Sequence, residues 1–258
     1  MYNKIIKERA LKYKGDKNML EIKNLTKIYK GGVKAVNNLS LKVMPGDIYG
    51  FIGHNGAGKT TTIKCVVGIH DFDEGDILID GVSVKDNPLK CKSMIAYVPD
   101  NPDLYEYLTG IQYLNFIADI FGISAKEREA KIKAEAEELG LVSALGDLIS
   151  SYSHGMKQKL AIIGALIHEP KLLILDEPFV GLDPKASIII KNKMKKLCQE
   201  GTAVFFSTHV LDVAEKICNK IAIIRGGELI ACGDTKELIR GESLESLFME
   251  VTENDKAD

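Results

Sequence analysis

The alternation of apolar and polar residues changes along the chain and predicts a mixed α/β fold. Two early segments, residues 22–29 and 36–43, alternate with a period of two, as half-buried strands do. The pair Gly31-Gly32 lies between them and favours a turn. We therefore expect an antiparallel hairpin beside the core.

Continuous apolar runs recur along the chain and are typical of strands that are buried on both faces. They span residues 48–52, 172–175, 203–207 and 221–224. Helical stretches separate the last three runs, so we expect βαβ units and a mostly parallel sheet. The pair Gly226-Gly227 should turn the chain back into a strand over residues 229–231.

We also expect a strand pair over residues 77–79 and 94–98, which encloses a turn at Asp80-Gly81 and a loop that contains Pro88. From residue 104 to about 167 the apolar period becomes helical, and the charged run 126–138 belongs to a later helix of this stretch.

These patterns suggest three parts. A basic extension, residues 1–18, is a candidate for disorder, and three interpretations of it stay open: an alternative translation start at Met19, a mobile tail and a contact with a membrane surface. The main domain spans residues 19–240, with its core at about 19–100 and 168–240 and a helical subdomain inserted at about 101–167. A tail, residues 241–258, follows, and in it Leu244, Leu247 and Phe248 predict a short amphipathic helix that packs on the core.

The composition is that of an ordinary globular protein, with 45% hydrophobic and 27% charged residues in a chain of 258. A formal net charge of −2 gives no general attraction for nucleic acid, so we expect no nucleic-acid partner. No apolar run approaches the roughly 18 residues that cross a bilayer, and no signal-peptide pattern opens the sequence. The five cysteines are scattered without metal-ligand spacing and are expected to be reduced thiols.

An octapeptide after the first apolar run fits the phosphate-binding pattern G-x-x-x-x-G-K-[ST]. Its members are Gly53, His54, Asn55, Gly56, Ala57, Gly58, Lys59 and Thr60. It lies between a predicted strand and a predicted helix, where glycine-rich backbone N–H groups and a helix N-terminus bind phosphate. We expect Lys59 to reach the β- and γ-phosphates of a nucleotide, Thr60 to bind Mg²⁺ and Thr61 to touch the α-phosphate.

Polar residues follow two later apolar runs. Asp176 and Glu177 end one of them, where a parallel sheet binds its ligands. Asp176 suits Mg²⁺, and Glu177 suits a general base that accepts a hydrogen bond from an attacking water. His209, after another run, is interpreted as a partner of the γ-phosphate and of that water. For each segment taken alone, solvated acids or a structural histidine remain the alternative.

In this order the motifs resemble those of the ATP-binding subunits of ABC transporters, over about residues 20–240. The resemblance includes the stretch Ser151-Tyr152-Ser153-His154-Gly155-Met156-Lys157-Gln158 ahead of Asp176-Glu177, then Gly181-Leu182-Asp183 and His209. It implies a P-loop NTPase core with a mostly parallel sheet, an antiparallel β side-sheet and an inserted helical subdomain. It also implies that ATP and Mg²⁺ lie between two subunits stacked head to tail, that Ser153 and Gly155 reach the partner's nucleotide, and that Tyr29 stacks on adenine.

Two positions depart from the pattern of the family. Where Leu-Ser-Gly-Gly-Gln is usual, His154 and Met156 replace the first glycine and the glutamine, and we expect binding across the dimer to survive with His154 oriented away from the phosphate. Where a glutamine usually follows Tyr-Val-Pro, this chain has Asp100. Two roles of Asp100 stay open, a water-mediated bond to Mg²⁺ and shaping of the contact with the membrane subunit.

The resemblance implies an ATP-hydrolysing subunit on the cytosolic face of a membrane. ATP binding would join two copies, or one copy and a related ATPase subunit, and a separate membrane-spanning permease would receive the motion. In the family, residues 97–113 line the groove for a permease helix. The apolar and aromatic residues offered here are Pro99, Pro102, Leu104, Tyr105, Tyr107 and Leu108.

The signature and the C-terminal residues look most like subunits of exporters for drugs, peptides or lipids. The alternative is a soluble ABC ATPase that acts on ribosomes or nucleic acid, although such proteins usually carry two cassettes or long coiled-coil arms. A regulatory binder without hydrolysis is a third class, which Glu177 and His209 disfavour. The transported substrate cannot be predicted, because the residues that meet it belong to another polypeptide.

Overall fold

Two β-sheets form the frame of the protein, which is described over residues 17–253 by a computed structural model. The smaller sheet has four strands in the order β2-β1-β4-β5, and neighbouring strands in it are antiparallel. Its strands are β1 (Leu20–Ile28), β2 (Lys34–Val43), β4 (Glu74–Ile79) and β5 (Val82–Ser83). The predicted hairpin is confirmed, since Ile22 of β1 faces Leu41 of β2.

The larger sheet has six strands in the order β10-β9-β3-β8-β7-β6 and is parallel except at β10. Its strands are β3 (Ile48–Ile52), β6 (Ile95–Val98), β7 (Leu172–Asp176), β8 (Ala203–Thr208), β9 (Lys220–Arg225) and β10 (Glu228–Asp234). All residues of β3, β7 and β8 are buried, as their continuous apolar runs predict. The parallel sheet and the return of the chain into β10 are therefore confirmed.

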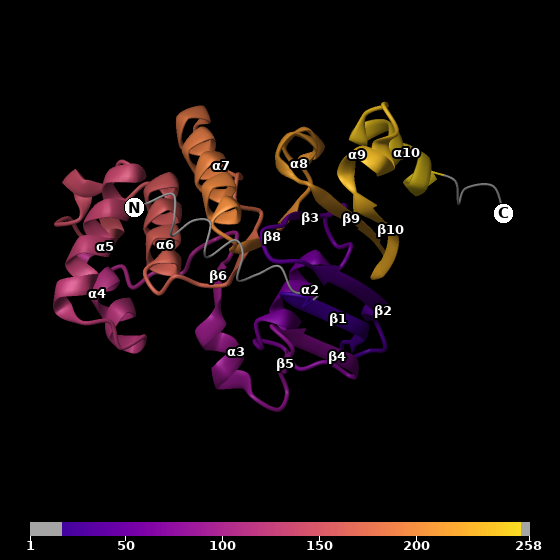
Figure 1. Cartoon of the computed structure of the whole chain (residues 1–258), viewed down its shortest axis with the longest axis horizontal. Coiled ribbons are helices and arrows are strands. Elements are labelled where there is room, and N and C mark those ends of the chain that lie inside the picture. Colours follow the sequence, from indigo (N-terminus) through magenta and orange to yellow (C-terminus); the bar gives the residue numbers. More distant parts are fainter. Residues whose placement is uncertain (1–16, 254–258) are drawn as a thin grey trace.

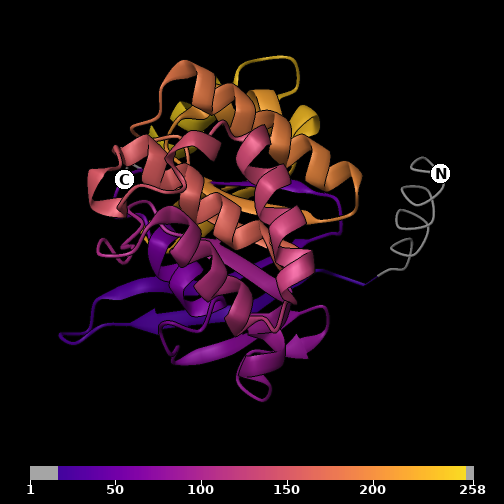
Figure 2. The same cartoon turned by 90° about the vertical axis from the view of Figure 1, so that its left-hand side faces the viewer.

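Helices cover the larger sheet and extend beyond it. They are α2 (Lys59–Val66), α3 (Pro88–Met94), α4 (Gly110–Ile120), α5 (Ala125–Glu138), α6 (His154–Leu166), α7 (Pro184–Gln199), α8 (Leu211–Ile217), α9 (Thr235–Ile239) and α10 (Leu244–Glu253), with short 3₁₀ turns η1 (Val142–Ala144) and η2 (Ile149–Ser151). Figure 1 shows α4, α5 and α6 gathered at one end of the long axis, and α9 and α10 towards the other. In Figures 1 and 2, α7 lies on the side of the larger sheet opposite the antiparallel strands.

The core has two halves, one on each face of the larger sheet. On one face, Phe51 and Phe205 pack against the antiparallel sheet and α2. On the other, Phe206 packs among residues of α6, α7, α8 and α10. Because successive strand residues point to opposite faces, Phe205 and Phe206 belong to different halves.

Helices α4 and α5, in the stretch predicted to be helical, each begin at a capping box. Thr109 and Gln112 form a capping box at α4, and Ser124 and Glu127 form another at α5. A buried cation, Lys193, links this end of the protein to α7: its Nζ lies 2.7 Å from Glu135 Oε2 and 2.9 Å from Glu138 Oε2, both on α5. The helices of this stretch are thereby joined to a helix that packs on the larger sheet.

The prediction of a strand pair over residues 77–79 and 94–98 is wrong. Both strands exist, but β4 pairs with β1 and β5, whereas β6 pairs with β7 in the other sheet. Nor does Pro88 lie in a loop. It starts α3, because proline at the first turn of a helix loses no hydrogen bond there. Helix α3 carries the chain from one sheet to the other.

The C-terminal amphipathic helix is confirmed as α10, in which Leu244 and Phe248 are buried. The prediction for residues 1–18 falls almost wholly outside the described range, and so does the end of the predicted tail, residues 254–258. Within the described range, Cys65, Cys91 and Cys218 are free and buried. Over that same range, the structure has no helix whose length and apolar character would let it cross a membrane.

Candidate functional site

The phosphate loop connects the end of β3 to the start of α2, and its shape requires glycine. Gly56 and Gly58 adopt φ angles of 79° and 106°, which side-chain-bearing residues rarely adopt. A Cβ atom on Gly53 would lie 2.5 Å from the Ile224 carbonyl oxygen, and one on Gly58 would lie 2.4 Å from that of Ala35. The backbone therefore turns tightly against its neighbours, as a loop that presents its N–H groups to phosphate must do.

Lys59 is buried and binds the backbone of the loop. Its Nζ donates to the carbonyl oxygens of Gly53, at 2.7 Å, and His54, at 3.2 Å. The same Nζ lies 3.4 Å from Glu177 Oε1. The cation expected to meet phosphate thus lies between the loop and the carboxylate expected to act as base.

Glu177 and His209 also meet. His209 Nδ1 lies 3.0 Å from Glu177 Oε2, and the His209 backbone N–H donates to the same oxygen at 3.3 Å. Glu177 has a φ of 48°, and this left-handed turn directs the chain away from β7 immediately after Asp176. The fold therefore brings together Lys59, Glu177 and His209, three residues that are far apart in the sequence.

Asp176 is fully buried at the end of β7, beside Ser207 of β8. The Ser207 hydroxyl donates to Asp176 Oδ1 and accepts the Glu177 backbone N–H at 3.0 Å. Burial raises the pKa of Asp176, while the neighbouring hydroxyl groups of Ser207 and Thr60 act in the opposite direction. The second oxygen, Oδ2, is buried and has no hydrogen-bond partner in the described protein.

Those observations fit a magnesium ion. A buried carboxylate oxygen without a partner, beside a threonine hydroxyl, is the kind of oxygen donor that Mg²⁺ uses, together with waters and phosphate oxygens. Among the described residues, no group of three or more His, Cys, Asp or Glu side chains is arranged to hold a metal alone. A metal at Thr60 and Asp176 would therefore need the phosphates of the nucleotide to complete its ligands.

A cavity of about 230 Å³ opens over the loop. It is lined by Ala35, His54, Asn55, Gly56, Gly58, Lys59, Thr60, Thr61, Asp100 and Glu177. Most of the predicted phosphate-loop residues and the exposed Asp100 thus face one space. Gly53, Ala57, Asp176 and His209 are not part of its lining, and the buried Gly53, Ala57 and Asp176 lie beneath the surface of the site.

Tyr29 lies at the edge of this site. Its hydroxyl is 3.4 Å from Thr61 Oγ1, and its ring meets the His70 ring edge to face at 6.1 Å between centroids. About 39% of Tyr29 is exposed, and Lys27 Nζ lies over its ring, 5.8 Å from the centroid.

Ser153 and Gly155 are not brought to this cavity by their own chain. Ser153 caps α6 and accepts the Met156 backbone N–H at 3.3 Å. The His154 ring packs over Gly181, where a Cβ atom would come within 2.8 Å of it. The start of α6 therefore presents an exposed serine and a glycine to the outside.

Sequence reasoning gave no role to Ser207, although it links Asp176 to the backbone of Glu177. The signal for Ser207 was its position at the polar end of the apolar run 203–207. That polar end indicated only the position of His209. Asp176 lies opposite Ser207 because β7 and β8 are adjacent strands of the sheet, and a single sequence does not specify which strands are adjacent.

Together, the α/β fold and the loop between β3 and α2 define a P-loop nucleotide-binding protein. The family model for the ABC transporter matches residues 36–180. The ABC-type transporter ATP-binding protein EcsA of Bacillus subtilis (strain 168) is 35% identical over 243 residues, which cover 92% of this chain and 98% of EcsA. The chain belongs to the ABC transporter family, as an ATP-binding protein.

Solved structures agree with this membership. One of an ATP-binding subunit of an ABC transporter has a TM-score of 0.86 at 35% identity and covers 91% of this chain and 99% of its own. A dimeric post-hydrolysis structure of the ATP-binding cassette MJ0796, bound to ADP and Pi, has a TM-score of 0.79 at 25% identity and covers 84% and 99%. The expected P-loop NTPase fold with an antiparallel side-sheet is confirmed.

Proposed function

We propose that this protein hydrolyses ATP and thereby powers a membrane transporter of the exporter type. The observation that carries the proposal is the meeting of Lys59, Glu177 and His209 at the mouth of the phosphate loop. A protein that only bound nucleotide would need the lysine but not a carboxylate and an imidazole aimed at the same place.

In this proposal Glu177 is the general base. Its carboxylate is largely buried, and Oε2 is held by the side chain and the backbone of His209. The γ-phosphate would compete with Glu177 for Lys59, because both are anions that a single ammonium group attracts. Release from Lys59 would leave Oε1 free to accept a hydrogen bond from the attacking water.

Mg²⁺ would be held by Thr60 and Asp176, and it would offset the charge that develops on the phosphate oxygens. Ser207 orients Asp176 by donating to Oδ1, which leaves Oδ2 for the metal. Asp100 lines the same cavity and is a further candidate ligand.

The site would be completed by a second subunit. Ser153 and Gly155 do not line the cavity of their own chain, and MJ0796 forms a dimer with ADP and Pi. An exposed helix start with a serine cap and a glycine suits close approach to a phosphate of the partner's nucleotide. In this arrangement the helices from α4 to α6 would form a subdomain that carries the signature to the partner's site.

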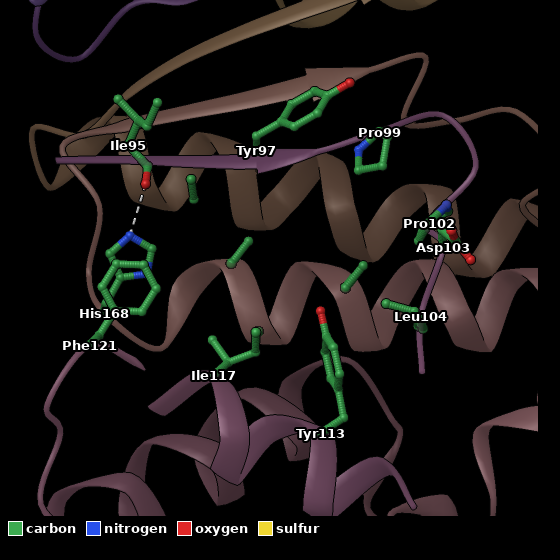
Figure 3. A pocket seen from close by; sticks show the side chains of 14 residues that line it. Ile95, Tyr97, Pro99, Pro102, Asp103, Leu104, Tyr113, Ile117, Phe121 and His168 are labelled. Atoms are coloured by element: carbon green, nitrogen blue, oxygen red, sulfur yellow. Dashed lines mark hydrogen bonds between the residues drawn. The ribbon is translucent and has the colours of Figure 1, made fainter. Parts of the chain in front are cut away.

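A groove of about 250 Å³ beside α4 and α6 is proposed as the contact with a membrane-spanning permease (Figure 3). Its lining is largely apolar and includes Tyr97, Pro99, Pro102, Leu104 and Tyr113. Of the residues offered from the sequence, Pro102 and Leu104 are buried, whereas Tyr105 and Tyr107 are exposed and lie close together, with ring centroids 5.9 Å apart. An apolar groove with exposed tyrosines at its side is suited to receive a short helix.

One end of the groove is closed by a stacked pair of rings (Figure 3). The Phe121 and His168 rings are parallel, with 3.7 Å between their centroids, and His168 Nε2 hydrogen-bonds the Ile95 carbonyl oxygen. Burial lowers the pKa of His168. Its Nε2 donates in this contact, because the partner is a carbonyl oxygen. The groove is therefore largely apolar, and the exposed Asp103 contributes a negative charge to its lining.

The first experiment compares ATP turnover of the protein with that of Glu177→Gln, and the matched control is Glu237→Gln, since Glu237 is an exposed residue of α9. Loss of a general base should lower kcat by about 10²-fold or more and leave ATP binding intact. The variant should also accumulate as an ATP-bound dimer in size-exclusion chromatography. Turnover of Glu177→Gln at the rate of the parent would refute this role of Glu177.

Purification in mild detergent separates the transporter from the alternative. Recovery of a multispanning membrane protein supports the proposal, and recovery of ribosomes or nucleic acid supports a soluble ABC ATPase. Export is then tested in vesicles that contain the recovered complex, by the direction in which substrate moves when ATP is supplied outside.

A further inference from the structure

The C-terminal helix α10 contacts the phosphate loop, which no motif in the sequence indicated. The ring of Phe248 meets the His54 ring edge to face, with 4.8 Å between centroids and 69° between planes. Phe248 is only 5% exposed, whereas His54 belongs to the exposed tip of the loop. A loop residue therefore rests on a side chain that comes from nearly 200 residues further along the chain.

Helix α10 is attached to the core near both ends. The Leu244 backbone N–H donates to Glu215 Oε2 of α8 at 2.7 Å, and Arg225 Nη1 of β9 donates to the Val251 carbonyl oxygen at 3.3 Å. Leu244 is fully buried. Figure 1 shows α10 next to α9, near β9 and β10. Phe248 is thus presented by a fixed element.

Other supports hold the loop at its base. Gly53 is pressed against Ile224 of β9, and the Gly227 N–H donates to the Ala57 carbonyl oxygen at 2.9 Å. Neither reaches the tip, where Gly56 has open space in place of a Cβ contact. The ring contact with Phe248 does reach the tip, and it acts on the side chain of His54.

His54 matters because its carbonyl oxygen organises the loop. That oxygen accepts the Ala57 N–H at 3.1 Å and the Lys59 ammonium at 3.2 Å. A shift of His54 would alter both hydrogen bonds. The position of His54 consequently affects the turn of the backbone and the cation together.

We propose that Phe248 is a positioning residue for nucleotide binding, which holds His54 so that the phosphate loop is already shaped for its ligand. The inference rests on the proposed use of this loop to bind ATP. A loop that is competent for only part of the time binds its ligand more weakly in proportion to that fraction. Aromatic pairs of this geometry correspond to about a two- to tenfold change in an equilibrium constant.

The test measures binding of Mg-ADP to the full chain by calorimetry, together with KM and kcat for ATP. Phe248→Leu keeps an apolar side chain of similar reach but removes the ring, and Phe248→Ala removes both. His54→Ala removes the other ring, and the double variant closes a mutant cycle. Glu250→Ala is the matched control, since Glu250 also belongs to α10 and is exposed.

We expect Phe248→Leu, Phe248→Ala and His54→Ala each to raise Kd and KM by about two- to tenfold with kcat unchanged. The double variant should be no weaker than either single variant, and Glu250→Ala should match the parent. Thermal unfolding checks that each protein is folded, and His54→Ala measures the contact from the loop side if Phe248→Ala fails to fold.

Unchanged Kd in all the Phe248 and His54 variants would overturn the inference while the parent still binds ADP. Additive effects in the cycle would overturn it as well, because the two rings would then act independently. A rescue by Phe248→Leu to the affinity of the parent would assign the effect to packing of α10 and also refute the role of the ring pair. A parent that binds no nucleotide would instead refute the proposed function.

Discussion

The buried ion cluster between α5 and α7 gives a stability prediction whose size follows from its geometry. Lys193 is 5% exposed, and its Nζ has a carboxylate oxygen at 2.7 Å and another at 2.9 Å, from Glu135 and Glu138. Lys193→Met keeps an unbranched side chain of similar length and removes the charge. The two carboxylates would then lie close together without the cation between them.

Removing one partner of a fully buried ion pair costs about 3–5 kcal/mol. Here Glu135 and Glu138 retain 20% and 33% of their side-chain exposure, so water takes over part of the lost interaction. We therefore expect a loss of about 2 kcal/mol in the free energy of unfolding. For a protein of this size that corresponds to a decrease of about 4–8 °C in Tm.

The effect should depend on pH in a defined direction. Burial acts to raise the pKa of Glu138, but Lys193 and Lys196 outweigh it and hold that pKa below its ordinary value of 4.5. A carboxyl whose pKa is lower in the folded state contributes its full stability above about pH 4.5 and loses it as the pH falls through the folded value. The difference between parent and variant should therefore be largest at neutral pH and smaller at about pH 3.5.

Thermal unfolding of the full chain, followed by circular dichroism at both pH values, measures this difference. Lys216→Met is the control, because Lys216 and Asp212 form an exposed pair on one face of α8 and should contribute less than about 0.5 kcal/mol. A Tm of Lys193→Met equal to that of the parent at neutral pH would refute the reasoning about the cluster. A difference that is just as large at acid pH would refute its electrostatic origin.

Three further predictions concern the site. Asp100→Gln should keep nucleotide binding and change turnover by less than about tenfold, and complete loss of binding in calorimetry would show that this position is not aligned with the family's glutamine. Ser207→Ala leaves Asp176 Oδ1 and the Glu177 N–H without their partner, so urea unfolding should show a loss of about 1–3 kcal/mol, and an unchanged midpoint would contradict it. Removal of Mg²⁺ with a chelator should weaken nucleotide binding in the parent but not further in Asp176→Asn, and equal weakening in both would argue against Asp176 as a ligand.

Much of the fold could be predicted because local patterns carry it. The alternation in β1 and β2, the apolar runs of β3, β7 and β8 and the glycine turn before β10 each reflect burial of the strand itself. The partners of β4 and β6 could not be predicted, since an apolar strand fits either sheet equally well. No local pattern indicates that the chain passes from one sheet to the other through α3. Pro88 misled in the same way, because proline is compatible with a loop and with a first helical turn.

The candidate site also has a part that the sequence predicts and a part that only the structure shows. The phosphate loop is contiguous, so the spacing of its glycines and Lys59 was sufficient to locate it. The contacts of Lys59 with Glu177, of Ser207 with Asp176 and of His54 with Phe248 join distant segments and required the structure. A serine or a phenylalanine has no distinctive spacing that would have assigned these contacts in advance.

The segment after β6 faces two places at once. Asp100 lines the cavity over the phosphate loop, while Pro99 and Pro102 line the groove beside α4 and α6. Pro99 and Pro102 each have a fixed φ angle, which narrows the conformations open to this segment. A nucleotide that displaces Asp100 would change the shape of the groove within a few residues, without any long chain of intervening contacts. In the proposed function, the nucleotide site and the permease contact would therefore be separated by only the few residues of this loop.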